Sequence, residues 1–176
     1  MTETLSKRFV NEMANQYTLQ FNVYRDEAIG TIPLDFYAEF QRRDEKYLMS
    51  KSIKVWGVEV QQYAFVTQLD EVSKDTVQRF ATEIDRHIPS FVPKKQEHMT
   101  TYFVGVIVTN DSINHELIKQ IKRARKIQFL KYGWYGWADR YIAVVSLKDK
   151  SVYVHKKGRE FITAFESALL KGDTEG

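Results

Sequence analysis

The chain has 176 residues, of which 43% are hydrophobic and 14% aromatic, and a formal net charge of +3. This length and apolar content predict one domain with a closed core and exclude a mainly disordered chain. The absence of cysteine excludes disulfides, thiolate metal sites and a cysteine nucleophile, and no apolar run approaches the roughly 18 residues that a membrane span needs.

The N-terminal stretch repeats an apolar residue at every fourth position, at Leu5, Phe9, Met13 and Tyr17. This spacing predicts an amphipathic helix over residues 5–17. The N-terminal residues Met1 to Arg8 carry charges but lead into no apolar segment of the signal-peptide kind. We therefore expect a soluble, cytoplasmic protein with no membrane partner.

Residues 33–42 predict a second helix. Pro33 suits the first position of a helix, because no hydrogen bond from its nitrogen is needed there. Leu34, Tyr37 and Phe40 then keep helical spacing. A strand over the same residues is the alternative, and the sequence leaves it open.

The next segment predicts two strands and then a helix. Apolar and polar residues alternate over 46–59, which is typical of a strand with one wet face, and a second strand is expected over 62–69. Ser73 is a favourable N-cap for a helix over 73–88, whose apolar residues form one stripe. Pro89 is expected to end that helix.

The strand expected at residues 100–109 is the most distinctive segment of the chain. Tyr102 to Val108 are apolar apart from Gly105, so the segment lacks the alternation of a strand with one wet face. Both faces should therefore be covered, as in the central strand of a sheet between helices. Gly105 indicates that another group packs closely against the backbone at this point.

The C-terminal third predicts a helix, a hairpin and a last helix. Their expected bounds are 112–126, then 140–147 and 151–155 for the hairpin, then 158–171, with Gly172 as a helix stop and a frayed tail at 173–176. No linker divides the chain, so we expect residues 1–176 to form a single α+β domain with a central mixed sheet flanked by helices. The element order is compatible with a restriction-endonuclease-like core without a clear active site, by analogy alone.

Positive charge is concentrated in the second half of the chain. Residues 1–90 carry 11 Lys and Arg against 14 Asp and Glu, whereas residues 91–176 carry 15 against 9. A basic stripe along and beyond the helix expected at 112–126 consists of Lys119, Lys122, Arg123, Lys126 and Lys131. Such a stripe can bind phosphates, so an anionic partner is a hypothesis, either nucleic acid or an acidic protein surface. The alternative is a solvated helix face, which charged helix surfaces more often are.

Two tryptophans follow the basic stripe, in the run Tyr-Gly-Trp-Tyr-Gly-Trp at residues 132–137. Aromatic side chains beside cations can stack on nucleobases, which makes Trp134 and Trp137 candidate binding residues. The alternative is that both complete the core, because tryptophan is on average well buried. The sequence favours this second interpretation.

A metal-dependent hydrolase is the second functional hypothesis. Nucleases of the restriction-endonuclease type place an acid and a lysine two residues apart on a strand, where they hold a divalent metal and activate water. Asp44 and Lys46 have that spacing, with Glu45 between them and Glu59 farther along. Short combinations of this kind are frequent by chance, so surface charge and helix capping are the alternative.

No motif in the sequence predicts a cofactor. Histidines never occur in pairs at metal-ligand spacing, and glycine-rich phosphate-binding loops are absent. We therefore expect no cofactor and no metal, and the favoured hypothesis is a non-catalytic binding module rather than an enzyme. The oligomeric state stays open.

A series of short segments has a distinctive order and separation over residues 34–170. The segments are Glu45-Lys46-Tyr47, Lys51, Tyr63-Ala64-Phe65, Glu97-His98-Met99, Thr101-Tyr102, Lys126, Lys131-Tyr132, Gly136-Trp137 and Lys157-Gly158-Arg159. Together they resemble an uncharacterised prokaryotic family, a single domain of unknown function, in which glutamate replaces Gln62. The resemblance implies a shared fold and no particular activity. It leaves the N-terminal helix outside, as a peripheral element.

Overall fold

The computed structural model describes residues 4–42, 60–92, 100–130 and 136–175. In this part of the chain, seven strands form one sheet in the order β1-β4-β5-β6-β8-β7, and β9 also pairs with β8. The strands are β1 (Asn22–Arg25), β4 (Phe36–Arg42), β5 (Val60–Gln68), β6 (Thr100–Thr109), β7 (Arg125–Phe129), β8 (Trp137–Ser146) and β9 (Ser151–Tyr153). A separate small hairpin contains β2 (Ala28–Ile29) and β3 (Ile32–Pro33). The strand predicted at 46–59 lies outside the described residues.

The sheet is mixed, as predicted. Strands β5, β6 and β8 are parallel, and the other pairs are antiparallel. Strand β6 lies between β5 and β8, and its side chains are buried on both faces, with Phe103 and Ile107 on one face and Val104 and Val106 on the other. The predicted central strand is confirmed, and its first and last residues are the predicted ones, 100 and 109.

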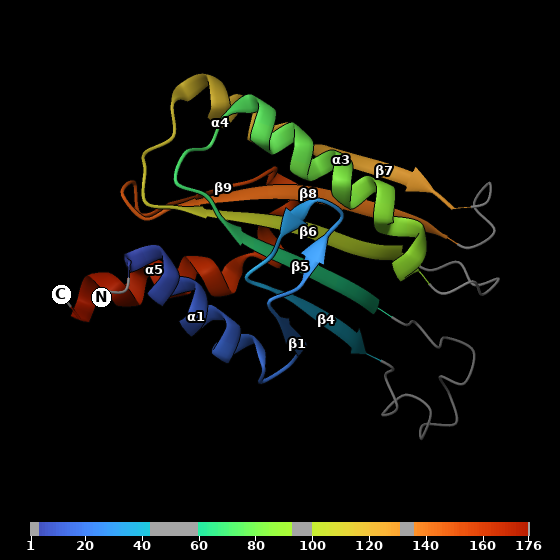
Figure 1. Cartoon of the computed structure of the whole chain (residues 1–176), viewed down its shortest axis with the longest axis horizontal. Coiled ribbons are helices and arrows are strands. Elements are labelled where there is room, and N and C mark those ends of the chain that lie inside the picture. The colour runs from blue at the N-terminus through green and yellow to red at the C-terminus, as the bar shows by residue number, and fades with distance from the viewer. Residues whose placement is uncertain (1–3, 43–59, 93–99, 131–135, 176) are drawn as a thin grey trace.

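Helices cover both faces of the sheet (Figure 1). Helices α1 (Leu5–Tyr17) and α5 (Thr163–Glu175) pack on one face, which we call the α5 face. Helices α3 (Lys74–Phe91) and α4 (His115–Lys122) pack on the other, the α3 face. The short 3-10 helix η1 (Lys156–Phe161) leads into α5. A sheet between two helical layers confirms the predicted α+β class.

Short polar side chains set the starts of three helices. The Thr4 hydroxyl accepts a hydrogen bond from the Lys7 amide, and Asn114 Oδ1 accepts one from the Leu117 amide at 2.8 Å. Ser73 caps α3 as predicted and forms a reciprocal pair of bonds with Thr76. These contacts satisfy amides that have no partner within the helix itself.

Helix α1 is part of the core. Met13 and Ala14 are fully buried, and the Tyr17 ring packs against Phe36 of β4 and Phe165 of α5 with centroid distances of 5.9 and 5.8 Å. The expectation that this helix is peripheral is therefore wrong, although its predicted bounds are confirmed.

The helix predicted at 33–42 is wrong and its alternative, a strand, is right from Phe36 to Arg42, which form β4. Phe36 and Ala38 are buried on the α5 face, while Tyr37 faces the other side, which is the two-residue period of a strand. Pro33 ends the β2–β3 hairpin, in which Gly30 has a φ of +58° that favours glycine. Helical and strand spacings overlap in so short an apolar segment. Strand β1 was not predicted.

The helix predicted at 112–126 is also wrong in its second half. Helix α4 ends at Lys122, and after two residues the chain enters β7, which pairs antiparallel with β8. In β7 the partly buried Arg125 lies on the same face as Ile127, which is the alternation of a strand. The basic residues before and within β7 keep helical spacing, so this alternation was not recognised in the sequence.

Two helices continue beyond their predicted last residues. Helix α3 continues through Pro89 to Phe91, and the Val92 amide still donates to the carbonyl of Ile88 at 3.3 Å. Helix α5 continues through Gly172 to Glu175. Proline has no backbone N–H and so removes one hydrogen bond of the helix. Near the C-terminal end of α3 this loss affects only the last turn.

Replacing Gly105 by alanine is expected to destabilise the protein by about 1–3 kcal/mol, the usual cost of overpacking a core. A Cβ atom there would lie 2.6 Å from Ile84 Cδ1 and 2.9 Å from both Ile142 Cδ1 and Phe80 Cε2, which confirms the predicted close approach. Urea unfolding measures the effect. The control is Gly172→Ala in α5, where no atom lies within 4 Å, and equal stability of the two variants would contradict the prediction.

Candidate functional site

The basic stripe does not lie on one helix. Lys119 and Lys122 belong to α4, and Arg123 follows as its C-cap, all three exposed. Lys126 lies on β7, and Lys131 is outside the described residues. The stripe is therefore divided between a helix end and a sheet edge, and each part has its own surroundings.

Lys126 lies beside an acid of α3. Its Nζ is 3.7 Å from Asp85 Oδ2, and the same carboxylate receives two hydrogen bonds from the buried Arg140, at 2.8 and 2.9 Å. Lys126 keeps 57% of its side chain exposed, yet its charge is shared with this ion pair. It contributes less positive potential than the sequence suggested.

Lys122 instead borders a cavity of about 310 Å³ at the sheet edge, together with Lys150 and Arg159. Arg159 Nη1 also lies 3.3 Å from Glu166 Oε2, an exposed ion pair that adds little stability. Three cations from α4, the β8–β9 turn and η1 thus meet around one hollow. Nothing in the sequence predicted this cluster, because its members are far apart along the chain.

Trp137 is exposed at the start of β8. In the register of β7 and β8, Trp137 is opposite Phe129. Ile127 lies two residues from Phe129 along β7 and therefore on the same face. The exposed fractions are 37% for Trp137, 68% for Phe129 and 45% for Ile127. We call these three residues the aromatic patch. Trp137 therefore does not complete the core, whereas Trp134 lies outside the described residues.

An acid–base cluster on the α5 face adjoins the aromatic patch. Arg125 donates two hydrogen bonds to the Asp139 carboxylate, at 3.0 and 2.9 Å, and the Tyr141 hydroxyl donates a third at 2.9 Å. Burial and the hydrogen bond to Asp139 raise the pKa of Tyr141 to about 12, and the hydrogen bonds to Asp139 raise the pKa of Arg125. The cluster fixes Arg125 in its charged form.

His155 lies beside the Tyr141 ring, with a centroid distance of 5.9 Å. Burial lowers its pKa from the ordinary value, and the positive charges of Arg125 and Lys156 lower it further. Asp139 raises the pKa of His155, and Lys157 has the smallest effect, which is again a lowering. Both lysines are exposed. The charges of Arg125, Lys156 and Lys157 thus act on one site of the α5 face, at the Tyr141–His155 contact.

Replacing Lys156 and Lys157 together by glutamine is expected to raise the pKa of His155. Removing two nearby positive charges makes the protonated imidazolium less unfavourable, so the value should move toward that of a free histidine. NMR titration of the imidazole resonances measures it, with Lys171→Gln as a control on α5. An unchanged His155 pKa would mean that the two lysines are too distant to act on this site.

The four residues of the hydrolase hypothesis, Asp44, Glu45, Lys46 and Glu59, all lie outside the described residues. That hypothesis therefore stays a prediction. Within the described ranges, no group of three or more His, Asp or Glu side chains is arranged to hold a metal ion.

Comparison with known proteins identifies a family. The model of a family described as domain of unknown function (DUF8052) matches residues 5–167. The match confirms the resemblance to an uncharacterised single-domain family and extends it to include α1. No curated protein and no solved structure matches the chain, so the analogy with restriction endonucleases stays a prediction. None of the described helices is long and apolar enough to cross a membrane.

Proposed function

We propose that this chain, which belongs to the DUF8052 family of domains without known function, is a non-catalytic module that binds single-stranded nucleic acid. The observation that carries the proposal is the aromatic patch of Ile127, Phe129 and Trp137, exposed on a sheet face beside a group of cations. Proteins that bind single strands combine these two features.

The aromatic patch suits stacking. Opposite side chains of an antiparallel pair lie about 4.5–5.5 Å apart, so Phe129 and Trp137 form one continuous apolar surface on β7 and β8. Unstacked bases bind to such surfaces, whereas the bases of a duplex are stacked on one another and do not reach them. The patch therefore favours a single strand over a duplex.

The cations suit the phosphates of the same strand. Arg125 lies on β7 four residues before Phe129, a distance of about 13 Å at the usual rise of a strand. Lys156 and Lys157 lie close enough to Arg125 to act with it on the pKa of His155. Farther along the same edge, Arg159 and Lys122 border the cavity of about 310 Å³. Each neutralised phosphate releases counterions and so favours binding.

An acidic protein surface is the other partner that these cations fit, and exposed aromatic side chains also occur at protein interfaces. Binding of a single strand uses the aromatic patch and the cations together, by stacking and by phosphate contacts. The hydrolase hypothesis rests on residues outside the described ranges, and no contact among the described residues favours it. We therefore advance one function.

Binding of a fluorescent ten-residue deoxythymidine oligonucleotide tests the proposal. The double variant Phe129→Ala/Trp137→Ala is expected to bind about tenfold more weakly than the wild type or worse, because base stacking contributes about 1–3 kcal/mol per base. Fluorescence anisotropy at low salt gives the dissociation constants.

Leu5→Ala is the matched control for this experiment. Leu5 is 70% exposed, as Phe129 is 68% exposed, but it lies at the start of α1. Its replacement is expected to leave binding unchanged. Equal binding by the wild type and the double variant, or no binding by the wild type, would contradict the proposal. Binding of an acidic protein instead would reassign the same surface.

A further inference from the structure

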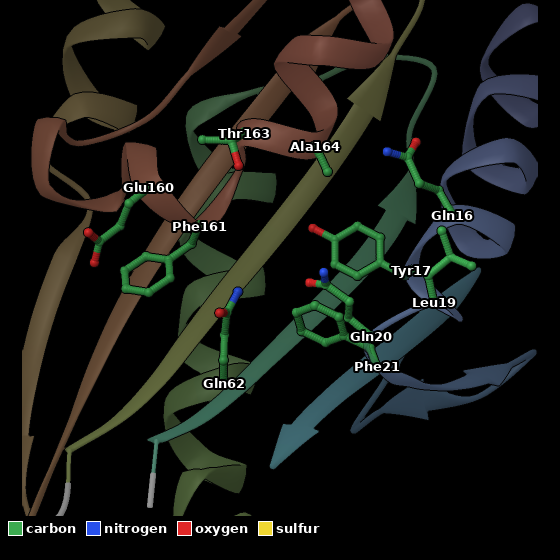
Figure 2. A pocket seen from close by; sticks show the side chains of 10 residues that line it. All are labelled: Gln16, Tyr17, Leu19, Gln20, Phe21, Gln62, Glu160, Phe161, Thr163 and Ala164. Atoms are coloured by element: carbon green, nitrogen blue, oxygen red, sulfur yellow. The ribbon is translucent and has the colours of Figure 1, made fainter. Parts of the chain in front are cut away.

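A second cavity lies on the α5 face, between the end of α1, strand β5 and the start of α5 (Figure 2). Its volume is about 290 Å³, at the lower limit of ligand pockets. Its lining includes Tyr17 and Gln20 from the α1 end, Gln62 from β5, and Phe161 and Thr163 from the η1–α5 segment. This volume suits a ligand of one or two rings.

The hydroxyl of Tyr17 is the most informative group in this cavity. The residue is 5% exposed, its ring is fixed by Phe21, Phe36 and Phe165, and burial raises its pKa, so that the hydroxyl stays protonated. This hydroxyl makes no hydrogen bond to any residue that the structure describes, and it points into the cavity. The hydroxyl opens onto the cavity, so a ligand with an acceptor atom can accept a hydrogen bond from it there.

Other neutral polar groups converge on the same space. Figure 2 shows the Gln62 amide and the Thr163 hydroxyl turned toward the region that the Tyr17 hydroxyl faces. Neither side chain forms a hydrogen bond with the part of the chain that is described. Amides and hydroxyls both donate and accept, which matches the mixed donors and acceptors on the edge of a nucleobase.

The charge of the cavity argues against a phosphate. Among the described residues that line it there is no lysine or arginine, and the charged side chain among them is the exposed Glu160. Aromatic rings are present on both sides, Phe161 from η1 and Phe21 from the turn between α1 and β1. A neutral, flat ligand with polar edges fits these walls, and a heteroaromatic base has that chemistry.

A line of paired residues across four strands connects the cavity with the aromatic patch. Gln62 is paired with Tyr102, Tyr102 with Asp139, and Asp139 with Ile127. Three strand spacings of about 4.8 Å separate Gln62 from Ile127, roughly 14 Å. Helix η1 lies between them, with Phe161 packed on Tyr102 at 4.6 Å, and carries Lys156 and Lys157.

We infer that this cavity holds a nucleobase and selects one base over the others. The inference rests on the proposed function: a strand stacked on the aromatic patch, with its phosphates at η1, would place a neighbouring base in the cavity. The Tyr17 hydroxyl and the Gln62 amide then read the edge of that base. The aromatic patch supplies affinity for any sequence, and the cavity supplies the preference.

Ten-residue oligonucleotides of deoxyadenosine, deoxycytidine and deoxythymidine test the inference. The wild type is expected to prefer one of them by about fivefold or more, the discrimination of one well-placed pair of hydrogen bonds. Tyr17→Phe and Gln62→Leu are expected to bring the three affinities within about twofold, at the level of the weakest. Phe129→Ala/Trp137→Ala is expected to weaken all three alike. Tyr24→Phe removes an exposed hydroxyl on β1 and serves as the control.

A titration with free adenosine, cytidine and thymidine separates the two proposals. If no oligonucleotide binds, the proposed function is wrong, yet shifts of the Gln62 amide resonances that disappear in Tyr17→Phe would still support a base in the cavity. If the oligonucleotides bind without preference and no nucleoside shifts Gln62, the cavity is not a base site and the inference is overturned. A preference that persists in both Tyr17→Phe and Gln62→Leu overturns it equally.

Discussion

Asp139→Asn is expected to destabilise the protein by about 3 kcal/mol, measured by urea unfolding at neutral pH. The Asp139 side chain is 8% exposed and accepts two hydrogen bonds from Arg125 and one from Tyr141. Asparagine keeps the shape and one acceptor oxygen, which in the Oδ2 position keeps the Tyr141 bond. Its amide NH2 then faces Arg125 Nε, so that hydrogen bond is lost together with the negative charge, and a guanidinium that is 24% exposed is left without its counterion.

Asp75→Asn provides a control with the same chemistry at the surface. Asp75 also accepts a hydrogen bond from an arginine, Arg79, at 2.8 Å, but the two side chains are 75% and 63% exposed. Exposed pairs contribute about 0–1 kcal/mol, so this variant is expected to lose less than 1 kcal/mol. Equal losses in Asp139→Asn and Asp75→Asn would show that Asp139 is no more important than a surface acid.

A second variant assigns the loss to the unpaired charge. Arg125→Met removes the guanidinium, and the double variant Arg125→Met/Asp139→Asn leaves no charge without a partner. Replacing both members of a buried pair costs less than removing one. The double variant is therefore expected to be more stable than Asp139→Asn alone, and strict additivity would contradict this explanation.

The central strand was predictable because its signal is local. An apolar run from Tyr102 to Val108 has no exposed face, so its burial on both sides follows from the residues themselves. The caps at Ser73 and the stripe of α1 are local in the same sense. Each of these predictions depends on residues within one or two turns of one another.

The segment around β7 was not predictable in this way. Lys119 to Lys126 keep helical spacing, but pairing with β8 and the buried contact of Arg125 with Asp139, fourteen residues away, favour a strand from Arg125 onward. Tertiary contacts override a local preference when they contribute more free energy. Because no strand was predicted at β7, the aromatic patch was not predicted either: Ile127 and Phe129 lie on one face in a strand but not in a helix.

The cavities depend still more on distant contacts. Tyr17 and Gln62 come from separate elements, and each alone is an ordinary residue of an amphipathic helix or a strand. Lys122 meets Lys150 and Arg159 for the same reason, through the packing of α4 and η1 beside β9. The sequence suggested the anionic partner through its charge asymmetry, whereas the fold determines which cations share a surface.

Raising the salt concentration from about 50 to 200 mM is expected to weaken single-strand binding about 50-fold. This value follows from four phosphate contacts, since log K falls by about 0.7 per neutralised phosphate for each tenfold rise in salt. The four exposed cations that we assign to phosphates are Lys122, Lys156, Lys157 and Arg159. The double variant Lys156→Gln/Lys157→Gln is therefore expected to lower the slope of log K against log salt by about 1.4.

The loss in Lys156→Gln/Lys157→Gln should be the same for every base composition, because phosphate contacts carry no sequence information. Its fold should be unaffected, as both side chains are exposed on η1. If the wild-type slope is near zero, phosphates do not contribute and the cations are a solvated surface. Binding that is weak at every salt concentration would also indicate that the cations are a solvated surface. In that case the aromatic patch is better explained as a contact for another protein.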